Sequence, residues 1–106
     1  MFVQINTDNQ ILSDADANER LEERIRAKLR RFERRLTHVE VHVSDVNGAK
    51  RGADKRVSLE VRPTGHEPIV VHAEAERVDN AVAIAADKAV RALGHALGKL
   101  ADSRAH

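Results

Sequence analysis

The sequence has no cysteine, tryptophan or tyrosine, and phenylalanine occurs only twice. Without cysteine the chain has no disulfide framework, no thiol chemistry and no zinc site with sulfur ligands. The scarcity of aromatic rings argues against a surface platform on which nucleic-acid bases stack. No apolar run approaches the roughly 20 residues of a membrane-spanning helix, and residues 1–9 lack the basic start and apolar stretch of a leader. These absences predict a cytoplasmic protein with no membrane partner.

What remains is the composition of one small folded domain. The chain has 106 residues, of which 42% are hydrophobic and 33% charged. We therefore expect a single domain over residues 1–106, with its last few residues frayed. The net charge of +1 is the sum of an uneven distribution. Residues 20–35 hold eight basic side chains against three acidic ones.

Four segments alternate apolar and polar residues, which is typical of strands with one buried face. They are residues 2–7, His38–Val46, a segment from Val57 that ends at Pro63, and a segment from Ile69 to Glu76. The alternation predicts a sheet with one face in the core. The other face would carry Gln4, Glu40, His42, Ser58, Glu60, His72 and Glu74.

Two longer segments place apolar residues three or four apart, which predicts amphipathic helices. The first helix runs from about Asp14 to Leu36 and buries Leu21, Ile25, Leu29, Phe32 and Leu36. The second runs from Val78 to about Asp102 and buries Val78, Val82, Ala86, Ala89, Leu93, Leu97 and Leu100. The order β-α-β-β-β-α predicts an α+β fold in which both helices pack on one face of a four-stranded sheet.

Basic residues form rows on these predicted helices. At about 100° per residue, one line beside the core stripe of the first helix carries Arg20, Arg24, Lys28, Arg31 and Arg35. A second line, on the later helix, carries Lys88, Arg91, His95 and Lys99. A predicted hairpin loop adds Lys50, Arg51, Lys55 and Arg56. Such rows indicate contacts with nucleic-acid phosphates, although charge alone equally fits a solubilising surface.

The sequence carries no catalytic signature. GxSxG, Walker A and GxGxxG patterns are all missing, and no carboxylate has an evident nucleophile or base to work with. His42 and His72 share the predicted open sheet face with acidic residues. No HExxH pattern or closely spaced ligand pair accompanies them, so they fit ordinary polar surface residues better than a metal site. We predict a protein that is not an enzyme and has no metal, no cofactor and no small-molecule substrate.

Two stretches resemble the short ribosome hibernation-promoting factors and the related ribosome-associated inhibitor, in the sigma-factor modulation family. The first is the run from Lys28 to Leu36 followed directly by the valine-rich strand. The second is the strand Val71–Ala75 leading into a helix with the pattern Asp-Lys-x-x-Arg-x-Leu at residues 87–93. The resemblance covers essentially the whole chain in the same order of elements.

The resemblance implies a factor that binds the small ribosomal subunit and the whole ribosome, as a monomer when bound. It would occupy the channel of messenger RNA and tRNA and silence translation in stress or stationary phase. Carried over position by position, the residues expected to contact ribosomal RNA (rRNA) are Lys28, Arg31, Arg35, Lys88 and Arg91. The chain stops after its second helix, so the resemblance is to the short class, which lacks the dimerisation domain of the long class.

The sequence departs from the family pattern at two places. Before the second helix the family commonly has an aromatic residue, whereas this chain reads Arg77, Val78, Asp79. His95 stands where the family often has lysine, and histidine is only partly charged near neutral pH.

Two other functions stay open from the sequence. One is a general double-stranded-RNA-binding module, which has a similar order of helices and strands. The other is a protein-interaction regulator, such as a sigma-factor modulator, that uses the open sheet face.

Overall fold

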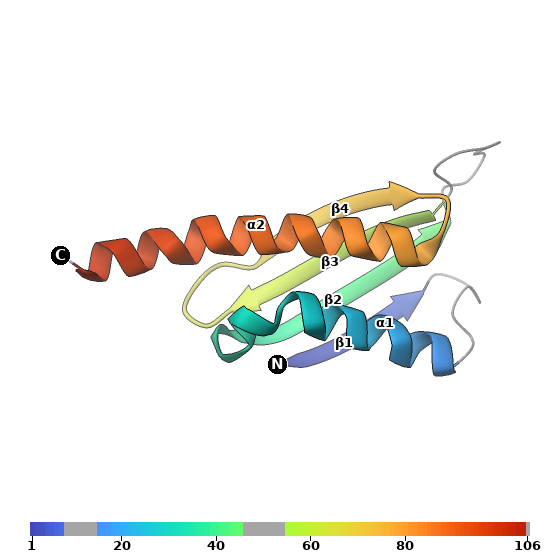
Figure 1. The fold of residues 1–106 in the computed structure, drawn as a ribbon, viewed down its shortest axis with the longest axis horizontal. Coiled ribbons are helices and arrows are strands. Elements are labelled where there is room, and N and C mark those ends of the chain that lie inside the picture. Colours follow the sequence, from blue (N-terminus) through green and yellow to red (C-terminus); the bar gives the residue numbers. More distant parts are fainter. Residues whose placement is uncertain (8–14, 46–54, 106) are drawn as a thin grey trace.

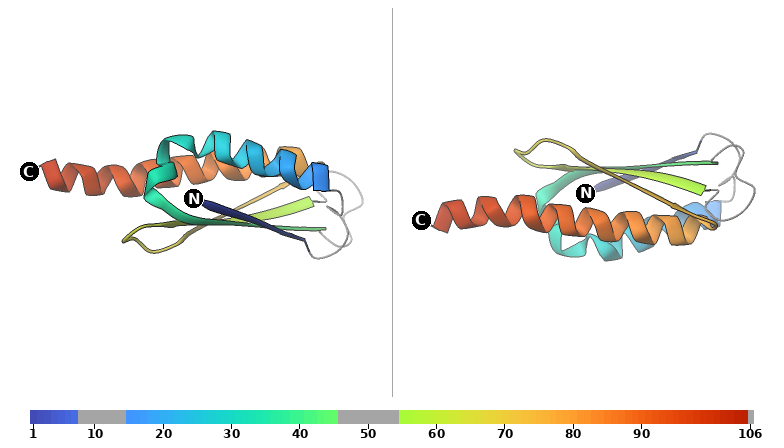
Figure 2. Two further views of the ribbon diagram at one scale, coloured as in Figure 1. Left: turned by 90° about the horizontal axis from the view of Figure 1, so that it is seen from below. Right: turned by 90° about the horizontal axis from the view of Figure 1, so that it is seen from above.

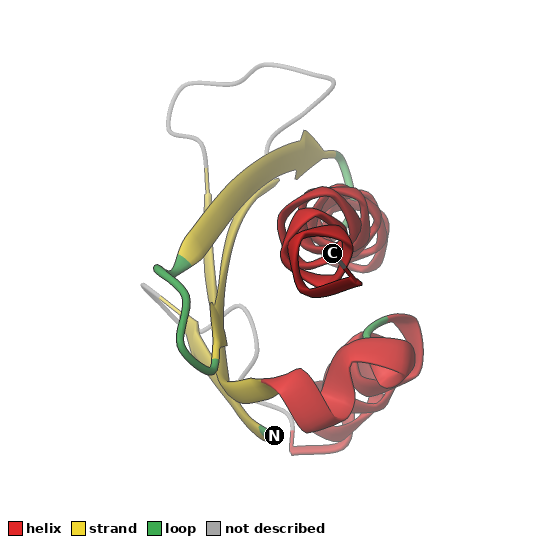
Figure 3. Ribbon diagram, turned by 90° about the vertical axis from the view of Figure 1, so that its left-hand side faces the viewer, coloured by secondary structure: helices red, strands yellow, loops and turns green. Residues whose placement is uncertain are grey.

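A curved four-stranded sheet carries two helices on one face (Figures 1 and 3). The computed structural model describes residues 1–7, 15–45 and 55–105, with only the backbone described at 15, 45 and 99–105. The strands are β1 (Phe2–Thr7), β2 (Leu36–Asp45), β3 (Lys55–Pro63) and β4 (Ile69–Ala75), and they lie in this order across the sheet. The predicted α+β fold, with its β-α-β-β-β-α order, is confirmed.

The sheet is mixed, and its pairing explains where the first helix lies. β1 and β2 are parallel, while β2 pairs with β3 and β3 with β4 in antiparallel register. Parallel neighbours need a crossover connection, and α1 (Ala15–Lys28) lies within that connection. Arg26 ties the helix to the start of β1, because its guanidinium donates to the backbone oxygen of Met1 at 3.1 Å.

The predicted strand alternation is confirmed at the core. Val39, Val41 and Val43 of β2 are fully buried, and the alternate residues Val57, Leu59 and Val61 of β3 are buried opposite them. At about 25 cal/mol per Å² of apolar surface removed from water, this two-strand valine and leucine layer is a major source of stability. The helices cover this face on the concave side of the sheet (Figure 3).

The prediction of one helix from Asp14 to Leu36 is wrong at its end. α1 stops at Lys28, residues Arg30–Arg35 form the 3₁₀ helix η2, and Leu36 already begins β2. The turn into the sheet explains the change: Leu36 already has the extended backbone of a strand (φ −112°, ψ 131°), and a short 3₁₀ turn makes this change of direction within a few residues. The tighter turn begins where the Phe32 N–H donates to the Leu29 oxygen at 2.9 Å. Phe32 and Leu36 stay buried as the chain bends into the sheet.

The second helix, α2 (Val78–Ala105), continues past the predicted end at Asp102. Its first half packs over β3 and β4, and its last turns extend beyond the sheet (Figure 2). Ala81, Ala85, Ala89 and Leu93 are fully buried beneath it. In the described part of the chain, no helix is long and apolar enough to cross a membrane.

The prediction that Lys55 and Arg56 lie in a basic loop is wrong. Lys55 and Arg56 belong to β3, where they pair in register with Ala75 and Glu74 of β4. The physical reason is a cross-strand charge pair that the alternation does not reveal: Arg56 lies opposite Glu74 and donates to its carboxylate, which extends the ladder beyond Val57. Lys50 and Arg51 lie outside the described residues.

Candidate nucleic-acid interface

Four basic side chains of α1 and η2 line the edge that faces α2. We call this row the seam; its members are Arg20, Arg24, Lys28 and Arg31. Successive members are three or four residues apart, so they repeat about once per helical turn, or roughly every 5.4 Å. All four are exposed. The sequence placed them beside the core stripe, and the structure shows that this side is the junction between the two helices.

Two seam cations meet carboxylates of α2. The Nζ of Lys28 donates to Oδ1 of Asp87 at 2.8 Å, and Nε of Arg20 lies 3.8 Å from Oδ2 of Asp79. The side chains of Lys28 and Asp87 are 45% and 50% exposed. Exposed pairs of this kind contribute about 0–1 kcal/mol, so they orient the cations without locking them. A stronger anion, such as a phosphate, can therefore replace the carboxylates.

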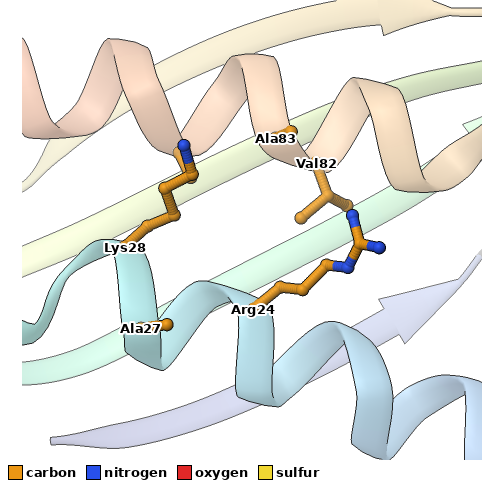
Figure 4. Close-up of a pocket in the computed structure, with 6 residues that line it drawn as sticks. Arg24, Ala27, Lys28, Val82 and Ala83 are labelled. Carbon is orange, nitrogen blue, oxygen red and sulfur yellow. The ribbon is translucent and has the colours of Figure 1, made fainter.

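The other two seam cations have no carboxylate partner among the described residues. Arg24 extends from α1 towards Val82 and Ala83 of α2 (Figure 4). Arg31 lies with its guanidinium carbon 4.8 Å from the ring centre of Phe32. One of its nitrogens is 3.7 Å from the point where Gly94 would carry a Cβ. Both guanidinium groups keep donors free for an external acceptor.

The predicted row on α2 does not form one continuous surface with the seam. Arg91 and His95 are exposed, and Arg91 has no ion pair in the part of the chain that the structure describes. Lys88 reaches the opposite flank, where its Nζ donates to the backbone oxygen of His72 in β4 at 2.7 Å. Asp87 takes the flank that faces α1, because neighbouring helical residues point about 100° apart. Lys99 belongs to α2, and its side chain lies outside the description.

Three further predicted contact residues are not members of the seam. Arg35 is half-buried at the end of η2, and its backbone oxygen accepts the N–H of Thr64 at 2.8 Å. Arg56 lies on the open sheet face, where it donates twice to Glu74, at 2.9 and 2.7 Å. Lys55 is half-buried in β3. The structure therefore brings together four of the predicted cations, whereas Lys55 and Arg56 lie in the sheet.

The open sheet face has a different electrostatic character from the seam. Its cations and carboxylates pair within the face, as in Arg56 with Glu74 and Arg62 with Glu60 at 2.6 Å. Glu40 accepts a hydrogen bond from Asn6 at 3.0 Å. No group of three or more histidine and acidic residues among the described side chains is arranged to hold a metal ion. This face offers phosphates little uncompensated positive charge.

Sequence reasoning missed the partners of the seam. Asp79 and Asp87 are eight residues apart in α2 and both lie towards α1. Their spacing is close to two helical turns, which predicts that they share a face of α2. It does not say what lies opposite, because that depends on how the two helices pack on the sheet.

Two solved structures of other proteins resemble the fold of this chain. A ribosomal subunit interface protein from Coxiella burnetii superposes with a TM-score of 0.71 at 18% identity, covering 92% of this chain and 99% of that one. The N-terminal domain of Thermus thermophilus Protein Y superposes with a TM-score of 0.60, also at 18% identity, covering 83% of this chain and 90% of that one. At these identities the likeness shows the fold. No curated protein sequence matches the chain.

The sequence itself carries the family assignment. Residues 11–101 match the family model described as sigma 54 modulation protein / S30EA ribosomal protein. The matched range contains α1, η2, β2, β3 and β4 and nearly all of α2, so it includes every residue of the seam. This family consists of ribosome-associated factors that are not enzymes. The chain belongs to the sigma 54 modulation protein / S30EA ribosomal protein family.

Proposed function

We propose that this protein binds the small ribosomal subunit by placing its seam against rRNA. The observation that carries the proposal is the row of four exposed cations at the junction of two helices, in a chain of a ribosome-associated family. Arginine and lysine in such a row neutralise successive phosphates and release their counterions. Arg91 is exposed on α2 and has no ion pair among the described residues, so we propose that it adds a phosphate contact outside the seam.

The proposed consequence of binding is steric. A folded domain seated in the channel of messenger RNA and tRNA excludes both ligands, so the ribosome stays silent in stress or stationary phase without any chemical step. The proposal places the protein in the cytoplasm with its ribosomal partner, bound as a single copy. Phosphate contacts from helix edges fix position without reading base sequence, which suits a partner whose surface is mostly RNA backbone.

Co-sedimentation with purified small subunits and whole ribosomes on sucrose gradients tests this function. We expect near-stoichiometric binding at low salt. About four phosphate contacts should lower the affinity by roughly fiftyfold between about 50 and about 200 mM salt. Absence of binding at low salt would contradict the proposal. A preference for isolated duplex RNA over intact subunits would instead indicate a general double-stranded-RNA-binding module.

The open sheet face supports a second candidate, a protein-interaction regulator of the sigma-factor modulation type. Phe2 is 59% exposed there, and its ring lies 5.3 Å from that of His38. The charges of this face are largely paired internally, so contacts with a protein would depend little on salt. Binding to a sigma factor that survives high salt, together with failure to bind ribosomes, would favour this function.

Asp87→Asn is expected to strengthen binding to small subunits roughly two- to fivefold, because the exposed pair with Lys28 is worth at most about 1 kcal/mol. The substitution frees the Lys28 ammonium for a phosphate. Glu23→Gln is the matched control, since it removes one negative charge from an exposed residue of α1 that has no ion pair in the described structure. Filter binding of both variants measures the difference. Weaker binding by Asp87→Asn would show that Asp87 orients Lys28 for its phosphate instead of competing with it.

A further inference from the structure

A hollow of about 270 Å³ lies between α1 and α2, in the middle of the seam (Figure 4). Val82 and Ala86 form its buried floor, and Ala83 is half-buried beside them. The long side chains of Arg24 and Lys28 reach across from α1 (Figure 4). The hollow therefore has an apolar floor and two cations at its rim. Ala27 of α1 completes the lining.

The lining restricts the chemistry of an occupant. The four apolar residues offer no side-chain donor or acceptor, so the buried part of an occupant must be apolar on the surface that it presents. The rim requires negative charge close to that apolar part, because both polar side chains are cations. Pockets that enclose drug-sized molecules measure about 300–1,000 Å³. The smaller volume here suits a single flat ring system.

The two rim cations differ in availability. Lys28 is already held by Asp87 at 2.8 Å. Arg24 is exposed and has no ion pair among the described residues, so its guanidinium is free to accept an anion. A guanidinium binds phosphate oxygens through two parallel N–H donors and also stacks on aromatic rings. Arg24 can therefore contact both the phosphate and the base of one nucleotide.

We propose that the hollow takes one unpaired RNA nucleotide, its base against Val82, Ala83 and Ala86 and its phosphate on Arg24. This inference rests on the proposed binding of rRNA and specifies which RNA feature the seam engages. A base inside a duplex is stacked and paired, so only a nucleotide turned out of a helix, in a loop or a bulge, can enter. Because the floor has no hydrogen-bonding side chain, the site accepts any base, as sequence-tolerant single-strand sites do.

Ala83→Leu tests the occupant without altering charge. The larger side chain fills the hollow from α2, so affinity for a short single-stranded RNA of mixed sequence is expected to fall roughly tenfold. The salt dependence should not change, because no phosphate contact is lost. Ala92→Leu is the matched control: Ala92 is half-buried on the same helix and does not line the hollow. Affinity of Ala83→Leu equal to that of Ala92→Leu would overturn the proposal.

Methyl NMR of the full chain tests independently whether a nucleotide enters the hollow. Addition of the single-stranded RNA should shift the methyl signals of Ala27, Ala83 and Ala86, whereas a duplex RNA of the same length should leave them in place. Equal shifts with both RNAs, or shifts confined to other residues, would contradict a nucleotide in the hollow. Shifts produced by a free nucleoside monophosphate at similar concentration would show a small-molecule site instead and would overturn the assignment to RNA.

The two proposals fail separately under these measurements. Ribosome binding that the Ala83→Leu substitution leaves unchanged, together with unshifted alanine methyls, retains the seam and rejects the hollow. Shifted methyls and weaker oligonucleotide binding by Ala83→Leu, in a protein that does not co-sediment with ribosomes, retain the hollow and reject the ribosomal partner. Thermal unfolding of both leucine variants confirms that the fold is intact before either conclusion is drawn.

Discussion

The double variant Arg24→Gln/Arg31→Gln is expected to bind small ribosomal subunits between roughly tenfold and a hundredfold more weakly than the natural chain at moderate salt. Both residues lie on the seam, and neither has a carboxylate partner in the described structure. Their removal therefore loses two available phosphate contacts without releasing an acidic residue. The slope of log affinity against log salt should become shallower by about 1.4, at about 0.7 for each single-strand contact.

The matched control is Arg30→Gln/Arg34→Gln. These arginines of η2 are also exposed, and removing them changes the net charge by the same amount. Neither has a hydrogen bond or ion pair with α2 in the described structure, so we expect a loss of no more than a few-fold from the weaker long-range field. Co-sedimentation and filter binding at several salt concentrations compare the two variants. Equal losses would mean that total charge, and not the seam, determines binding.

Most of the fold was predictable because the buried side chains recur at two simple spacings, one for strands and one for helices. The alternating valines of β2 and β3 predict the buried sheet face, and the three- and four-residue spacing of the helices predicts their core stripes. The same spacing could not separate α1 from η2. Leu29 and Phe32 are three residues apart, which fits an α-helix and a 3₁₀ turn equally well. The outcome there depended on the bend into β2, where Leu36 already has extended backbone.

The site was less predictable than the fold. Helical periodicity correctly grouped Arg20, Arg24 and Lys28, because that grouping is a property of one helix. The same row also included Arg31 and Arg35, which lie in η2; of these two, Arg31 joins the seam. Three other features depend on how two elements pack together. They are the position of these cations against α2, the carboxylates that meet two of them, and the hollow between the helices. Similarly, Lys88 looked equivalent to Arg91 in sequence, yet it reaches His72 on the far flank of α2. The packing of each helix against the other helix and against the sheet decides such contacts, and a pattern within one segment does not contain it.

Leu29→Ala is expected to lower the free energy of unfolding by about 2–5 kcal/mol, through lost burial and the cavity that remains. Leu29 is fully buried where α1 gives way to η2, and its backbone bonds link the two helices: its N–H donates to Ile25 at 3.0 Å and its oxygen accepts from Phe32. A domain of this size has about 5–15 kcal/mol in total. The substitution therefore removes a large share of the free energy of unfolding. The loss falls at the junction of α1 and η2, which positions Lys28 and Arg31.

Urea unfolding followed by far-UV circular dichroism measures this loss as a lower midpoint. Ile84→Ala is the control, because Ile84 is 42% exposed on α2 and should lose less than about 1 kcal/mol. We expect the slope of free energy against urea to be the same for both variants, since neither changes the surface exposed on unfolding by much. A Leu29→Ala protein as stable as Ile84→Ala would mean that the junction repacks. The seam would then depend less on the transition from α1 to η2 than its geometry indicates.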